Sequence, residues 1–118
     1  MKNPMFKSTH TLEERKIESQ RVKDRYPDRM PIICERNAMC KQVPELDKTK
    51  YLVPRDLTIA QFMYVIRKRI KLDADRALFV FINHTIPPSA ALLSDVYERN
   101  RDEDGFLYVT YSGEQTFG

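Results

Sequence analysis

The stretch TIAQFMYVIRKRI, residues 58–70, carries the clearest helix pattern of the chain. Thr58 stands three residues before Gln61, which is the capping-box arrangement that begins a helix. The apolar residues of the stretch recur at the spacing of a single helical face: Ile59, Phe62, Met63, Ile66 and Ile70. The Lys and Arg residues near its end suit the negative pole of a helix dipole. The sequence therefore predicts a helix whose apolar face is buried in a core.

Four short apolar segments surround this helix and are predicted to be strands. Two of them precede the helix, at residues 30–35 and 50–53, and two follow it, at residues 77–82 and 106–111. Between the last two, a short helix is predicted to begin at a Ser89 cap and to run through Asn100. The resulting order, ββαββ, predicts an α+β fold of the β-grasp type with a mixed sheet.

Two features of these segments bear on the sheet. Pro31 and Pro54 suggest a strand pair with an open edge, because proline is confined mainly to edge strands and strand ends. Such an edge offers unpaired backbone groups to a peptide. The almost continuously apolar run at residues 77–82 favours a central position in the sheet.

A second helix is predicted in front of this domain. Thr11 and Glu14 form another capping box, and the helix should end near Tyr26 because Pro27 follows. Only a thin apolar stripe results, so we expect the helix to lie on the body rather than inside it. The sequence is thus divided into an N-terminal helical extension (1–29), a β-grasp domain (30–112) and a C-terminal tail (113–118).

Charge is distributed unevenly over these parts. The net charge is +3, and residues 1–29 hold eight bases and five acids, whereas the remaining residues hold twelve of each. The excess therefore lies in the N-terminal extension. Two interpretations stay open: a solvated helix face, or a contact surface for an acidic partner or an anionic membrane.

Several classes of function are disfavoured by composition. The 118 residues contain no apolar run of the length that spans a membrane and no secretory signal, and three glycines cannot build a glycine-rich phosphate loop. Cys34 and Cys40 have no zinc spacing and are expected to be reduced thiols. His10 and His84 are isolated, so we expect no metal site, no cofactor and no catalytic residues. No basic–aromatic motif indicates nucleic-acid binding.

Four motifs carry a specific resemblance that covers nearly the whole chain. They are KYLVP-x-DLT (50–58), QF-x-YVIRKRI (61–70), PP-x-AAL (87–92) and DGFLYV-x-YSGE-x-x-FG (104–118). Together they resemble the autophagy ubiquitin-like modifiers of the GABARAP and microtubule-associated protein light chain type. The resemblance implies a ubiquitin-like β-grasp fold with a two-helix N-terminal extension. Residues 36–42 depart from the family's usual pattern, and Val22 stands where isoleucine is common.

The resemblance also implies a lipid-conjugated function. Gly118 would be joined through its carboxylate to phosphatidylethanolamine, with Phe117 beside it as a recognition residue for the tail. An activating-like enzyme and a conjugating-like enzyme would perform the transfer, and a cysteine protease would process and delipidate the protein. The chain would act in the cytoplasm and, once lipidated, on the autophagosome membrane, with delivery to a vacuole or lysosome.

A second implied function is the recruitment of cargo receptors and adaptors that carry an aromatic-x-x-aliphatic peptide. The residues implied for the aromatic anchor are Glu18, Val22, Pro31, Ile33, Lys50, Leu52 and Phe106. Those implied for the aliphatic anchor are Tyr51, Val53, Pro54, Leu57, Phe62, Val65 and Ile66. Basic residues implied to meet acidic flanks of the peptide are Arg29, Lys48, Lys50 and Arg69.

An alternative function stays open beside this one. It is a non-conjugated adaptor in vesicle traffic or cytoskeletal attachment that would use the basic N-terminal helices. The two hypotheses differ in whether function requires Gly118.

Overall fold

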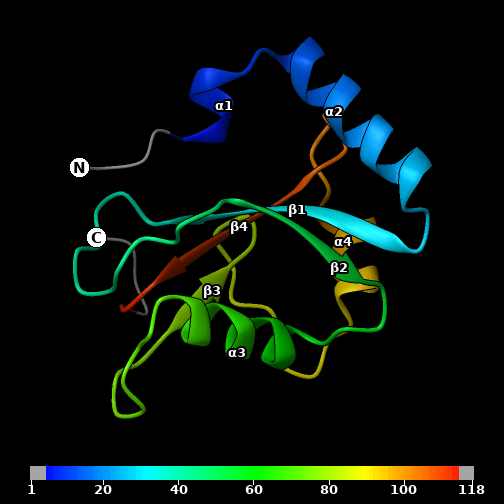
Figure 1. The fold of residues 1–118 in the computed structure, drawn as a ribbon. Helices are drawn as coiled ribbons and strands as arrows, with labels where there is room; N and C mark the ends of the chain where they lie inside the picture. The colour runs from blue at the N-terminus through cyan, green and yellow to red at the C-terminus, as the bar shows by residue number, and fades with distance from the viewer. Residues whose placement is uncertain (1–4, 115–118) are drawn as a thin grey trace.

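A four-stranded sheet with the order β2-β1-β4-β3 organises the protein, seen in a computed structural model that describes residues 5–114 (Figure 1). The strands are β1 (Arg29–Arg36), β2 (Lys50–Pro54), β3 (Phe79–Phe81) and β4 (Leu107–Ser112). Strand β1 runs antiparallel to β2 and parallel to β4, and β4 runs antiparallel to β3. The mixed sheet predicted from the element order is confirmed.

Helices cover both faces of this sheet. Figure 1 shows α1 (Phe6–Thr9) and α2 (Leu12–Arg25) above the sheet and α3 (Ile59–Arg69) beneath it. The main core lies on the α3 side, and α4 (Leu93–Asn100) contributes to it through Leu93 and Tyr97. A smaller cluster on the α1 side joins Phe6, Ile33 and Phe106. Among residues 5–114 no helix combines the length and the hydropathy needed to cross a membrane.

Both predicted capping boxes are confirmed. The N–H of Glu14 donates to Thr11 Oγ1 at 3.1 Å, and the N–H of Thr11 donates to Glu14 Oε1 at 2.8 Å. The Thr58 and Gln61 pair repeats the arrangement at 3.2 and 2.9 Å. Helix α2 is indeed laid on the body, since Ser19 is its single buried residue among those described.

The central position predicted for residues 77–82 is wrong. Only Phe79–Phe81 form a strand, and β3 lies at an edge of the sheet, whereas β1 and β4 are central. Leu78, Val80 and Ile82 are nevertheless buried, because their side chains pack into the main core. The apolar run at residues 77–82 thus reflects side chains buried in the core from a short edge strand, and not a central position in the sheet.

The Ser89 cap is also wrong, because α4 begins later. Its N-cap is Leu92, which makes no side-chain cap bond. The carbonyls of Ser89 and Ala91 instead accept the N–H groups of Ala60 and Ile59 at 2.9 and 3.0 Å. These residues therefore pair with the first turn of α3 and are not free to begin a helix.

Candidate functional site

The outer edge of β2 presents backbone groups that no other strand of the described residues pairs with. The N–H of Cys34 donates to the Thr49 carbonyl at 2.8 Å, which sets the alternation of bonded and non-bonded pairs between β1 and β2. By that alternation, the N–H and C=O groups of Lys50 and Leu52 face away from β1. Among residues 5–114, Arg29 Nη1 donates to one of these outward groups, the Leu52 carbonyl oxygen, at 3.4 Å.

A cavity of about 370 Å³ lies between this edge and α2. It is lined by Glu18, Arg21, Val22, Pro31, Lys48, Lys50, Tyr51, Leu52 and Phe106. The lining includes every residue predicted for the aromatic anchor except Ile33. That residue is fully buried and packs with Phe6 and Phe106 behind the cavity. The cavity walls thus come from α2, β1, β2 and the residue before β4.

The rim of this cavity is mainly basic. Lys50 forms an ion pair with Glu18, which joins β2 to α2 across the opening. Lys48 lies with its Nζ 5.0 Å from the centre of the Tyr51 ring. Arg21 was missed by sequence reasoning, although it directly precedes Val22 and stands three positions after Glu18 on the same helix. An acidic peptide segment suits this rim.

The residues predicted for the aliphatic anchor fall into two groups. Tyr51, Val53, Phe62 and Ile66 are buried in the main core. Leu57 is half-buried at the core boundary, and Pro54 and Val65 are exposed. The Tyr51 and Phe62 rings meet edge to face, with centroids 6.1 Å apart. The structure therefore buries four members of the set in the core and leaves Pro54 and Val65 at the surface.

The basic residues predicted to contact acidic residues of the peptide differ in their surroundings. Arg29 and Lys48 are exposed. Arg69 is engaged with Asp47, and its Nη2 lies 2.8 and 2.9 Å from the two carboxylate oxygens. The hydrogen bond from Arg69 holds the pKa of Asp47 below its ordinary value. Binding of an acidic partner to Arg69 requires exchange with this internal carboxylate.

The predicted tail residues Phe117 and Gly118 lie outside the described part of the chain. At the base of the tail, the N–H of Gly113 donates to Cys40 Sγ at 3.3 Å, and Gln42 Nε2 donates to Glu114 at 2.8 Å. Both cysteines are free thiols. Burial raises the pKa of Cys34 far above the ordinary value, which leaves that thiol inert near neutral pH.

The potential metal-ligating side chains of the described residues are dispersed. Within residues 5–114, no three His, Cys, Asp or Glu side chains come together as a group that could hold a metal ion. His10 stacks on Phe6, with ring centroids 4.2 Å apart. The strand Phe79–Phe81 has Val80 and Phe81 buried.

The sequence and the fold were compared with known proteins. The family described as "Autophagy protein Atg8 ubiquitin like" matches residues 14–118. Autophagy-related protein 8c of Arabidopsis thaliana is 60% identical over 118 residues, which cover 100% of this chain and 98% of the relative. Autophagy-related protein 8 of Saccharomyces cerevisiae (strain YJM789) is 58% identical over 113 residues, 96% of each chain.

A solved structure agrees with these relatives. The crystal structure of Trypanosoma brucei ATG8 superimposes with a TM-score of 0.89 at 50% identity, covering 99% of this chain and 100% of that one. A family match over most of the chain, full-length relatives above 50% identity and a shared ubiquitin-like fold all agree. The chain therefore belongs to the Atg8 family of ubiquitin-like autophagy proteins.

Proposed function

We propose that this protein is a modifier conjugated through Gly118 to phosphatidylethanolamine, which acts in autophagosome formation and recruits cargo receptors. The recruiting function rests on one observation above all: the open edge of β2 lies beside a basic-rimmed cavity. An extended peptide that carries an aromatic-x-x-aliphatic motif fits this arrangement. It pairs with the outward backbone groups of Lys50 and Leu52 as an additional strand.

The geometry of β2 gives a reason for the spacing of the motif. Side chains alternate between the two faces of a strand, so residues three positions apart point to opposite faces. Lys50 and Leu52 line the cavity on the α2 side, whereas Val53 belongs to the core on the α3 side. Tyr51 contributes to both, because it lines the cavity and its ring also packs on Phe62 of α3. A paired peptide thus directs its aromatic anchor toward α2 and its aliphatic anchor toward α3.

Burial of the two anchors alone does not supply the free energy of micromolar binding. Burial of two apolar anchors contributes roughly 3–6 kcal/mol before ordering costs are subtracted. Micromolar affinity needs about 8 kcal/mol net. Backbone pairing along β2 and contacts between Arg21, Lys48 or Arg29 and acidic residues of the peptide supply the remainder.

The conjugating function is supported by family membership, since the family match extends through Gly118. In this scheme an activating enzyme adenylates the Gly118 carboxylate and takes it as a thioester, with release of AMP. A conjugating enzyme passes the acyl group to the amine of the lipid, which forms an amide and frees the enzyme's thiol. The reactive cysteines belong to those enzymes, and Cys34 of this chain is buried.

Conjugation is tested by incubating the protein with activating and conjugating enzymes, ATP and vesicles containing phosphatidylethanolamine. We expect mass spectrometry to find a lipid adduct on Gly118, and no adduct when ATP is omitted or when Gly118→Ala is used. Absence of the adduct from the wild type, with identical behaviour of the variant, contradicts a conjugated modifier.

A second candidate function is a non-conjugated adaptor, favoured by the exposed Lys16, Arg21 and Arg25 of α2. It predicts that removal of residues 113–118 leaves localisation in cells intact, whereas charge reversal at these three positions abolishes it. The conjugated modifier predicts the opposite result for the tail deletion.

A further inference from the structure

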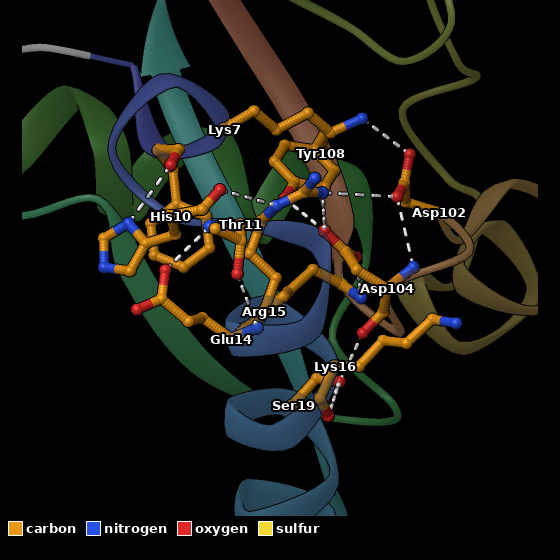
Figure 2. Close-up of polar contacts among 12 residues, drawn as sticks. Lys7, His10, Thr11, Glu14, Arg15, Lys16, Ser19, Asp102, Asp104 and Tyr108 are labelled. Atoms are coloured by element: carbon orange, nitrogen blue, oxygen red, sulfur yellow. Dashed lines mark hydrogen bonds and ion pairs between the residues drawn. The ribbon is translucent and has the colours of Figure 1, made fainter.

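One buried carboxylate, outside every predicted site, connects α2 to the sheet (Figure 2). Asp104 is 1% exposed and lies in the turn before β4. Its Oδ2 accepts Arg15 Nη1 at 2.7 Å and the Tyr108 hydroxyl at 2.5 Å, and its Oδ1 accepts the Phe106 N–H at 2.8 Å. The Ser19 hydroxyl donates to the Asp104 carbonyl oxygen.

Such a cluster is not explained by stability alone. Removing a carboxylate and a guanidinium from water is costly, and well-packed apolar residues often replace a buried ion pair without loss of stability. Here Arg15 and Asp104 have side chains 12% and 0% exposed. What the cluster provides is a fixed geometry between two elements, because each oxygen of Asp104 is held by a named donor.

The neighbouring contacts reinforce that geometry. Lys7 Nζ lies 2.7 Å from Asp102 Oδ1, so α1 is tied to the same turn. Gly105 has a φ of +92°, and a Cβ built there would lie 2.5 Å from Ser19 Oγ. The turn thus approaches α2 so closely that a side chain at position 105 would collide with the helix.

The elements that Asp104 joins are the two walls of the cavity beside β2. Glu18 and Val22 form the α2 wall, and Ser19, the buried residue between them, is bonded to Asp104. Phe106 belongs to the opposite wall, and its backbone N–H is bonded to the same carboxylate. Ser19 is the single buried residue of α2 among those described, and the Glu18–Lys50 ion pair is the other tie between α2 and the sheet at this cavity that the described residues show.

We propose that Asp104 is a positioning residue that sets the width of the cavity between α2 and Phe106 and so determines which aromatic anchor the cavity prefers. This inference rests on the proposed peptide binding. Asp104 does not line the cavity, so its effect passes through Arg15 and Ser19 to α2, and through the Phe106 backbone to the sheet.

The inference is tested with the full chain and the substitution Asp104→Asn. This amide retains an acceptor for the Phe106 N–H but loses the nearer of the two charges paired with Arg15, the other being Asp102 at 3.8 Å. Three acidic peptides carrying Trp, Phe or Tyr at the aromatic position are titrated calorimetrically, together with one whose aliphatic anchor is Ala. We expect the ratio of affinities between the Trp and Tyr peptides to change by about threefold or more, because positions in one contact network couple.

The loss caused by removing the aliphatic anchor should be the same in both proteins, because that anchor contacts the α3 side. The matched control is Asp75→Asn, which makes the same charge change at an exposed residue between α3 and β3. If Asp104→Asn folds poorly, the double variant Arg15→Met with Asp104→Asn removes both charges and should show the same altered ratio.

An unchanged ratio in a folded Asp104 variant, or an equal loss for every peptide, overturns the positioning role while leaving peptide recruitment intact. A wild-type protein that binds none of the peptides contradicts the recruiting function itself and, with it, the inference. A change in the Asp75 control equal to that of the Asp104 variant assigns the effect to net charge and also overturns the positioning role.

Discussion

Glu35 is a half-buried carboxylate on β1 whose Oε2 accepts the N–H of Phe6 at 2.6 Å. Burial raises the pKa of this carboxyl above its ordinary value, although the Phe6 hydrogen bond and the charge of Lys7 act in the opposite direction. The folded protein therefore binds more protons than the unfolded chain between the two pKa values. Stability contributed by this group falls as the pH rises through that window.

The substitution Glu35→Gln keeps an acceptor for Phe6 and removes the charge. We expect the free energy of unfolding to equal that of the wild type below about pH 4 and to exceed it above the window. Urea unfolding at a series of pH values measures the difference. Glu98→Gln is the control of opposite sign, because the Arg101 hydrogen bond lowers the pKa of Glu98. A Glu35 variant that is less stable at pH 8 contradicts the assignment.

Substitutions at two neighbouring residues of α3 are expected to affect stability and peptide binding differently. Ile66 is fully buried, whereas Val65 is 39% exposed beside it. Ile66→Ala is expected to lower the free energy of unfolding by about 2–5 kcal/mol through lost burial and a cavity. Val65→Ala should change it by less than about 0.5 kcal/mol. It should nevertheless weaken binding of an aromatic-x-x-aliphatic peptide by about fivefold, as calorimetry can measure. Similar destabilisation by both variants would contradict the assignment of Ile66 to the core and of Val65 to the peptide contact.

At the scale of elements, helices α2 and α3 could be predicted because their signals are local. A capping box and an apolar stripe lie within a few residues, and both boxes form as expected. The position of β3 could not be predicted, because strand order depends on the long-range pairing of β1 with β4. The start of α4 was missed for the same reason, since Ser89 and Ala91 pair with α3.

The residues of the candidate site could be predicted only in part. The resemblance assigned Val22, Leu52 and Phe106 to one cavity, and the structure brings them together. It also assigned Ile33, which faces the α1 side cluster behind that cavity. The role proposed for Asp104 could not be predicted from the sequence, because Asp104-Gly105 has the pattern of an ordinary turn. Its contact with Ser19 of α2 is evident only in the folded structure.

Helix caps give a prediction that distinguishes the two helices. Thr58→Ala should lower the global free energy of unfolding by about 1 kcal/mol, because α3 carries core residues. Thr11→Ala should cost a similar amount within α2, seen as amide exchange that is faster in α2 by roughly fivefold. Hydrogen exchange followed by NMR measures both. If Thr11→Ala accelerates exchange in the central strands as strongly as in α2, the helix is not a peripheral element.

For the whole molecule, the sheet has two outer strands, and the proposed function assigns them different roles. Strand β2 carries a cavity and basic side chains beside its edge, whereas β3 is three residues long and has Val80 and Phe81 buried. The N-terminal extension supplies one wall of that cavity and lies on the sheet through Asp104 and through the Phe6 cluster. In the proposed function, residues 1–29 and the sheet therefore form the peptide site together.

In the proposed function, a peptide adds to the sheet as a further strand at the outer edge of β2. This strand addition is tested by amide hydrogen exchange of the full chain, measured with and without an acidic aromatic-x-x-aliphatic peptide. At a free peptide concentration 100 times Kd, the amides of Lys50 and Leu52 are predicted to exchange about a hundredfold more slowly, while those of Phe79–Phe81 are unchanged. Protection of the β3 edge instead, or unchanged exchange at Lys50 and Leu52 with bound peptide, would contradict strand addition at β2.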